Sequence, residues 1–347
     1  MTDMGSSDNP RGQSLIAGWL FAVCVLLYLM IVIGGATRLT ESGLSIVEWK
    51  LATGWVPPLG EADWQKLFAE YQTSPQYQKV NRGMTLDEFK GIFWLEFIHR
   101  LWGRLIGVAF ALPMAFFWWR GWLDGALKGK LAIALLLGAG QGLLGWLMVK
   151  SGLVDDPRVS PHRLAAHLGL GILIYGYLFW LACDVARLAR AASGETTIFR
   201  RAAILAVLVF VTAVSGALVA GLRAGLAYNT FPLMDGRVIP EHYFAHGATL
   251  ANLFENVAAV QFNHRLLATA TLAAAVLFGL QVRRTRPGSR LRFAVAAVPL
   301  AGVLQYALGI ATLLSQVPVS LGVAHQGMAV LLLTAVLWAG WVAKPDA

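Results

Sequence analysis

The sequence EFIHR at residues 96–100 returns later in the chain as QFNHR at residues 261–265. Each copy places a histidine inside a long apolar segment, where an imidazole is costly and therefore usually has a function. Two more histidines, His167 and His325, stand near the start of later apolar segments. The four histidines fall on every second apolar segment, which predicts pairs that face each other inside a helical bundle.

The composition is that of a protein embedded in lipid. The chain has 347 residues, of which 57% are hydrophobic and only 14% are charged, whereas a soluble domain carries about 25% charged residues. The net charge of +9 does not indicate a nucleic-acid partner, because the basic residues are scattered over short loops between apolar runs. We therefore predict an integral membrane protein whose surroundings are the lipid bilayer.

About eight apolar runs are long enough to cross a bilayer, which takes roughly 20 residues. Their approximate bounds are 15–36, 92–119, 130–149, 162–183, 200–220, 263–282, 292–314 and 318–342. The first run is too long for the core of a signal peptide, so we expect it to be retained as a helix. The predicted fold class is an all-α integral membrane protein with eight transmembrane helices.

Basic residues in the short connections predict which side of the membrane each loop occupies. Those after the second, fourth and sixth runs include Arg120, Lys128, Lys130, Arg187, Arg190, Arg200, Arg201, Arg283, Arg284, Arg286, Arg290 and Arg292. The two chain ends, with Arg11 and Lys344, fall on the same side. We therefore expect both termini to be cytoplasmic and the longer loops to lie outside.

A second motif also occurs twice, as QGLLG at residues 141–145 and QYALG at residues 305–309. Two motifs and a following histidine in the same order predict two pseudo-symmetric four-helix bundles, residues 1–190 and 191–347. Because each repeat holds an even number of helices, the repeats would have parallel topology. His99 would then pair with His167, and His264 with His325.

Paired histidines on facing helices suit one cofactor above others. Neutral imidazole binds iron well, and two axial imidazoles hold a haem iron six-coordinate. The metal ligands predicted from the sequence are His99, His167, His264 and His325. The alternative is a set of hydrogen bonds between helices, which four histidines at matching positions make less favourable.

The two repeats differ at one informative position, where Glu96 in the first corresponds to Gln261 in the second. Glu96 and His99 are three residues apart and share a helix face. A carboxyl there can orient a ligand, pass protons or stabilise a cationic intermediate, and an amide cannot titrate. We therefore predict chemistry in the first half and a permanent cofactor in the second, while a purely structural hydrogen-bonding role for Glu96 stays open.

The arginines that follow the two histidines, Arg100 and Arg265, have two interpretations of equal weight. They either neutralise haem propionates or anchor their helices at the lipid headgroups.

Several longer strings carry a family resemblance. They are GGATRLTESGLS at residues 34–45, EWK at 48–50, Glu96-x-x-His99-Arg100, NTFPLMDG at 229–236, VQFNHR at 260–265 and AHQ at 324–326. In this order, covering nearly the whole chain, they closely resemble the heme A synthase family, in the type found in mitochondria and Gram-negative bacteria.

The resemblance implies a haem-dependent oxidoreductase that oxidises the C8 methyl group of heme O to a formyl group by successive hydroxylations. The product, heme A, serves terminal cytochrome oxidases. The resemblance further implies that His264 and His325 bind heme B in the second half. The substrate haem would lie in the first half, with His99, His167 and Glu96.

The resemblance also implies a location in the bacterial inner membrane. Expected partners are a heme O synthase that supplies the substrate, a ferredoxin-type electron donor and a second copy of the chain. Some members of the family carry a cysteine pair in the outer loop of each half. In this chain Cys24 and Cys183 lie inside apolar segments instead, so no thiol-dependent step is expected.

Two other functions are compatible with part of this sequence pattern. A di-haem b-type electron-transfer protein would explain the four histidines equally well, but it would not explain a carboxyl in one repeat alone. A haem or solute transporter would need polar residues at mid-membrane depth in broken helices, and the inner halves of these segments have few.

Overall fold

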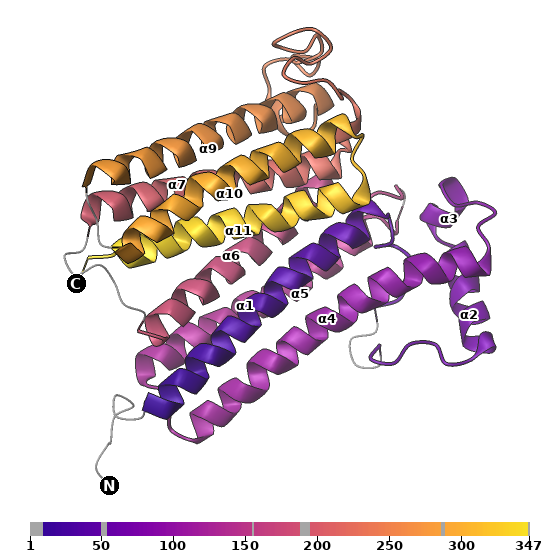
Figure 1. Ribbon diagram of the computed structural model, residues 1–347. Helices are drawn as coiled ribbons and strands as arrows, with labels where there is room; N and C mark the ends of the chain where they lie inside the picture. Colours follow the sequence, from indigo (N-terminus) through magenta and orange to yellow (C-terminus); the bar gives the residue numbers. More distant parts are fainter. Residues whose placement is uncertain (1–9, 50–53, 155, 188–194, 286–288, 346–347) are drawn as a thin grey trace.

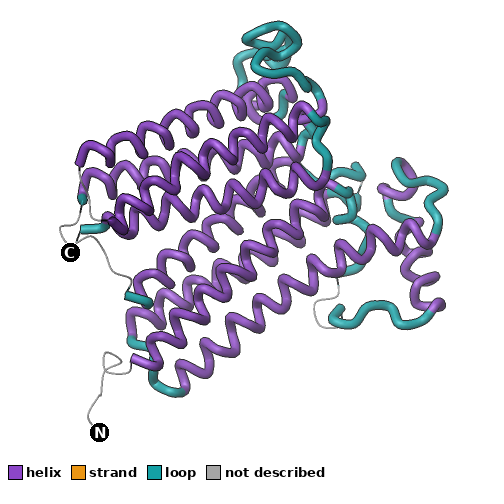
Figure 2. Tube along the Cα trace, in the orientation of Figure 1, coloured by secondary structure: helices purple, strands orange, loops and turns teal. Residues whose placement is uncertain are grey.

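The protein is a bundle of long helices capped at one end by loops (Figures 1 and 2). The computed structural model describes residues 10–49, 54–154, 156–187, 195–285 and 289–345. Within them, eight helices are long and apolar enough to cross a membrane, as predicted. These are α1 (Pro10–Leu39), α4 (Leu86–Trp119), α5 (Gly125–Ser151), α6 (Pro161–Val185), α7 (Thr196–Gly221), α9 (Val257–Thr285), α10 (Ser289–Leu314) and α11 (Val319–Ala343).

The long helices form two groups of four (Figure 1). In the first group α1 packs against α4 and α6, and α5 packs against α6 and more briefly against α4. In the second group α7, α9, α10 and α11 form a closed ring, each helix packed against two others. The groups meet where α1 and α6 contact α7 and α11. The all-α, eight-helix fold is confirmed.

The division into two pseudo-symmetric repeats stays a prediction. Its boundary at residues 190/191 lies outside the described residues, as do Arg190 and Arg286, two of the basic residues behind the predicted orientation.

Local signals set where the histidine-bearing helices begin. Thr85 and Glu88 form a capping box at the start of α4, in which Glu88 Oε2 accepts a hydrogen bond of 2.8 Å from the Thr85 amide. Ser160 caps α6, and Pro161 is its first residue. These caps fix the register in which His99 and His167 enter the bundle.

We call the end of the bundle opposite the start of α1 and the end of α11 its outer end. In the first group this end carries an extra layer of short helices. The short helices α2 (Glu61–Gln72) and α3 (Pro75–Lys79) lie beside the outer end of α4 (Figure 1). Tyr71 of α2 is fully buried against Phe89, and Phe93 and Phe97 extend the same aromatic cluster along α4. The second group has its own outer segment, with η2 (Ala224–Leu226) and α8 (Leu250–Phe254).

Polar contacts tie the two groups together at both ends. Arg38, at the outer end of α1, donates a hydrogen bond of 2.8 Å to the carbonyl oxygen of Ala220 on α7. At the other end, the indole nitrogen of Trp341 on α11 donates to Asp184 on α6 at 3.0 Å. Contacts at both ends oppose sliding of one group along the other.

Candidate haem-binding sites

The structure brings the predicted histidines together in two pairs. His99 on α4 lies within electrostatic range of His167 on α6. The same is true of His264 on α9 and His325 on α11. Each pair lies within one group of four helices and joins two of its helices.

Each imidazole ring packs against a glycine of a neighbouring helix. A Cβ atom built on these glycines would lie between 2.8 and 3.2 Å from a ring atom, so a larger side chain would displace the ring. The pairs are Gly34 with His99, Gly145 with His167, Gly216 with His264 and Gly309 with His325. The backbone of the neighbouring helix therefore determines where each ring can lie.

The ring of His264 has a defined orientation. Its Nδ1 atom is hydrogen-bonded to the hydroxyl of Ser215 at 2.8 Å. Because Nδ1 is engaged, Nε2 is the nitrogen left to bind iron. A partner on the far nitrogen commonly fixes the tautomer and orientation of a ligating histidine.

Replacing Ser215 with alanine is expected to weaken haem binding in the second half by about 10–100-fold, the usual cost of losing such a partner. Haem retained through purification, measured by absorption, checks this. Thr312→Ala is the control, because that hydroxyl donates to the Leu308 carbonyl of its own helix. Equal haem content in both variants would contradict the role of Ser215.

The other pair members are held less completely. In the described part of the chain, Nδ1 of His167 and Nδ1 of His325 are buried without a hydrogen bond of ordinary geometry. The main-chain carbonyls of Gln141 and Gln305 nevertheless lie close enough to influence the two rings. The Gln141 amide also donates to the main-chain carbonyl of His167 at 3.0 Å, which ties α5 to α6 beside the ring.

These residues fit haem better than a bare metal ion. Among the described residues, no three His, Cys, Asp or Glu side chains gather as a metal ion would require. Haem iron needs only axial ligands from the protein, because the porphyrin supplies the other four. Paired imidazoles seated on glycines, in an apolar bundle, provide such ligands.

Glu96 is buried, with 2% of its surface exposed, and accepts four hydrogen bonds. Its Oε2 atom accepts from the Ser45 hydroxyl at 2.7 Å and the Ile46 amide at 2.8 Å. Its Oε1 atom accepts from Nε and Nη2 of Arg100, at 3.0 and 2.5 Å. The carboxylate therefore joins α4 to the outer loop, and the structural role left open by the sequence has clear contacts.

The two arginines make matching contacts with the outer loops. Arg100 donates to the carbonyl of Ile46 at 2.9 Å, and Arg265 donates to the carbonyl of Tyr228 at 2.7 Å. Gln261 donates to the same Tyr228 carbonyl at 3.0 Å. Each half thus holds its loop with an arginine and the residue four positions before it. The first half uses a carboxylate where the second uses an amide.

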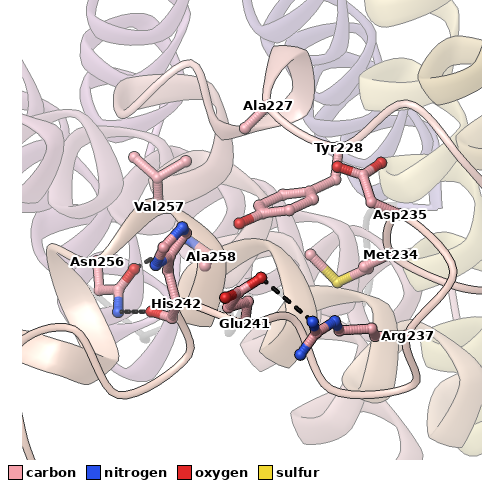
Figure 3. A pocket seen from close by; sticks show the side chains of 10 residues that line it. All are labelled: Ala227, Tyr228, Met234, Asp235, Arg237, Glu241, His242, Asn256, Val257 and Ala258. Carbon is pink, nitrogen blue, oxygen red and sulfur yellow. Dashed lines mark hydrogen bonds and ion pairs between the residues drawn. The ribbon is translucent and has the colours of Figure 1, made fainter.

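The remaining histidines, His162, His242 and His246, are exposed at the outer surface. His162 forms an ion pair of 3.3 Å with Glu255, and its side chain is 52% exposed. His242 lines a pocket in the outer segment of the second group, beside Tyr228 and an Arg237–Glu241 ion pair of 3.4 Å (Figure 3). That pocket contains none of the predicted site residues.

Some of these neighbouring residues could be predicted from the sequence, and others could not. The repeated Gln-x-x-x-Gly motif was visible, and its glycines turn out to seat His167 and His325. Ser215 gave no signal, because a serine inside a helix is unremarkable until its partner is known. Neither did Ser45, which reaches Glu96 from 51 residues away in the sequence.

The eight long apolar helices of the described chain define an all-helical, multi-pass membrane protein, and its buried histidine pairs are candidate haem ligands. Residues 17–337 match the model of one protein family, described as cytochrome oxidase assembly protein. The chain belongs to this family.

Relatives from bacteria and from a plant are similar over nearly the whole of this chain. The protein named "Heme A synthase" of Paramagnetospirillum magneticum is 50% identical over 341 residues, covering 96% of each chain. That of Nitrosospira multiformis is 49% identical over 329 residues, covering 94% of this chain and 92% of the relative. "Heme A synthase COX15" of Arabidopsis thaliana is 44% identical over 341 residues, covering 95% of this chain and 74% of the relative.

Proposed function

We propose that this protein is a heme A synthase, an oxidoreductase that converts heme O to heme A for cytochrome oxidase. The observation that carries the proposal is its near full-length similarity to proteins of that name. Two buried histidine pairs on facing helices support it, because both substrate and product are haems. The family relation gives no support to a di-haem electron carrier.

The two halves would divide the work. We assign the substrate haem to residues 1–190, with His99 and His167 as its axial ligands. Residues 191–347 would hold heme B between His264 and His325. The difference between Glu96 and Gln261 supports this division, because only the first half has a titratable group beside its histidines.

The chemistry converts a methyl group to a formyl group by two hydroxylations that would consume molecular oxygen and electrons from an external donor, after which the diol loses water. Bound heme B would supply electrons to the first half. His99 and His167 would orient the substrate, and the glycines behind them would limit how far the rings can move. Glu96 would hold a proton or stabilise positive charge near the reacting carbon, while its contacts with Ser45 and Ile46 keep the outer loop in place.

The setting follows from the helices and the loop charges. Eight apolar helices fit a multi-pass protein, and we place it in the bacterial inner membrane with both termini in the cytoplasm. Protease protection of terminal tags in intact cells would test this orientation. Proposed partners are a heme O synthase, a ferredoxin-type electron donor and a second copy of the chain.

The function is tested by supplying heme O and a reductant to the purified protein in oxygenated buffer and identifying the haems by mass. We expect heme A, with a hydroxylated intermediate at early times. Two heme B molecules per chain, with heme O unchanged, would instead support the electron carrier and overturn the proposal.

A further inference from the structure

The second group is closed between α9 and α10. The hydroxyls of Thr269 on α9 and Tyr306 on α10 are hydrogen-bonded at 2.9 Å. Nearer the cytoplasmic end, Gly302 packs so closely that an added Cβ would lie 3.2 Å from the Cβ of Ala275. The two helices therefore touch both beside the histidine level and below it.

The matching side of the first group is open. Counting along the repeated motifs puts Arg104 at the position of Thr269, Gly142 at that of Tyr306 and Gly138 at that of Gly302. The side chain of Arg104 reaches the loop between α1 and α2, where it donates to the carbonyl of Gly54 at 2.6 Å. Among the residues that the structure describes, a Cβ on either Gly138 or Gly142 would meet no atom within 4 Å. Consistent with this, α4 and α5 touch over far fewer residues than α9 and α10 do.

This opening, bordered by Gly107 on α4 and by Gly138 and Gly142 on α5, begins beside the substrate histidines. Gly138 lies seven residues from Gly145, so the two share a helix face about 10 Å apart along α5. Gly145 seats the ring of His167. A Cβ on Gly107 would also meet nothing within 4 Å. The open space thus extends from the level of His167 toward the cytoplasmic end of the bundle.

The lining of the opening is apolar and faces outward. Val108, next to Gly107 on α4, is 40% exposed, and Leu135, seven residues before Gly142 on the same face of α5, is 44% exposed. A ligand that enters here must therefore be compatible both with hydrocarbon and with a haem held between His99 and His167.

We propose that the opening between α4 and α5 holds the isoprenoid side chain of heme O. This inference rests on the proposed function. Heme O carries a long isoprenoid chain where heme B has a short vinyl group, so only heme O needs a lipid-facing channel beside its ring. The closed α9–α10 side of the second group suits a haem with short substituents. The opening would make the first half selective for tailed haems.

The test installs in the first half the residue that closes the second. Gly142→Tyr should raise the apparent Kd for heme O at least tenfold, while leaving the Kd for heme B at the same histidines unchanged. Both haems are titrated into the purified full-length protein and followed by absorption. Leu136→Tyr is the matched control, because Leu136 is 72% exposed on another face of the same helix, and it should bind both haems like the wild type.

The outcomes separate the opening from the function. If the wild type makes heme A and Gly142→Tyr binds heme O as tightly as the wild type does, the proposed position of the isoprenoid chain is wrong and the proposed function stands. If the wild type neither prefers heme O nor oxidises it, the proposed function fails as well. The haem spectrum of the second half reports folding. Should Gly142→Tyr lose that spectrum, the smaller Gly138→Val must show the same selective loss, and equal binding of both haems by it overturns the proposal.

Discussion

Replacing His325 with alanine is expected to leave the purified protein without the tightly bound haem of its second half. His325 and His264 are the only two predicted iron ligands in that half, and each ring is held against a glycine that fixes its place. Losing a hydrogen-bond partner of a ligand already costs about 10–100-fold in affinity. Losing the ligand itself should therefore weaken haem binding by more than about a hundredfold. Haem content per chain, measured after purification, gives the result.

His99→Ala provides the contrast for this experiment. It should keep the haem of the second half, because its ring lies in the other helix group, against Gly34 of α1, and it should lose binding of added heme O. His162→Ala controls for general loss of a histidine, since His162 is exposed and forms an ion pair with Glu255 at the surface. If purified His325→Ala keeps its bound haem and purified His99→Ala loses it, the proposed assignment of the two halves is reversed.

The sequence sufficed to predict the elements that depend on local pattern. Apolar runs of sufficient length predicted eight helices, and the structure has eight such helices among its described residues. The pairing of His99 with His167 followed from the order of two repeated motifs. These features repeat or lie close together in the chain, so a single sequence contains enough information to predict them.

The contacts of Glu96 could not be predicted, because they depend on how a loop folds back. Ser45 and Ile46 reach Glu96 from about fifty residues away, and no local pattern relates them to it. For the same reason, the sequence could not show that α9 packs closely against α10 while α4 has few contacts with α5. A glycine such as Gly142 reads as a small residue for close helix packing, and only the structure reveals that no atom approaches it.

Replacing Glu96 with glutamine is expected to abolish most heme A formation while leaving haem binding intact. The variant should fold, because the second half already has Gln261 at this position, and Arg265 binds main-chain carbonyls without a carboxylate partner there. Arg100 likewise keeps its hydrogen bond to the Ile46 carbonyl. Loss of a proton-transfer group typically slows a reaction by about 10²–10⁴-fold. Mass analysis should therefore find heme O or a hydroxylated intermediate accumulating.

Two further variants separate chemistry from loop anchoring. Ser45→Ala removes one hydrogen bond to the carboxylate but keeps its charge, so it should retain most activity if Glu96 acts chemically. Asp87→Asn, a change at an exposed carboxylate of the same helix, should behave like the wild type. Full heme A formation by Glu96→Gln would eliminate the chemical role. A matching loss of activity in Ser45→Ala and Glu96→Gln would instead show that Glu96 acts by holding the outer loop, because Ser45→Ala weakens that contact while leaving the carboxylate in place.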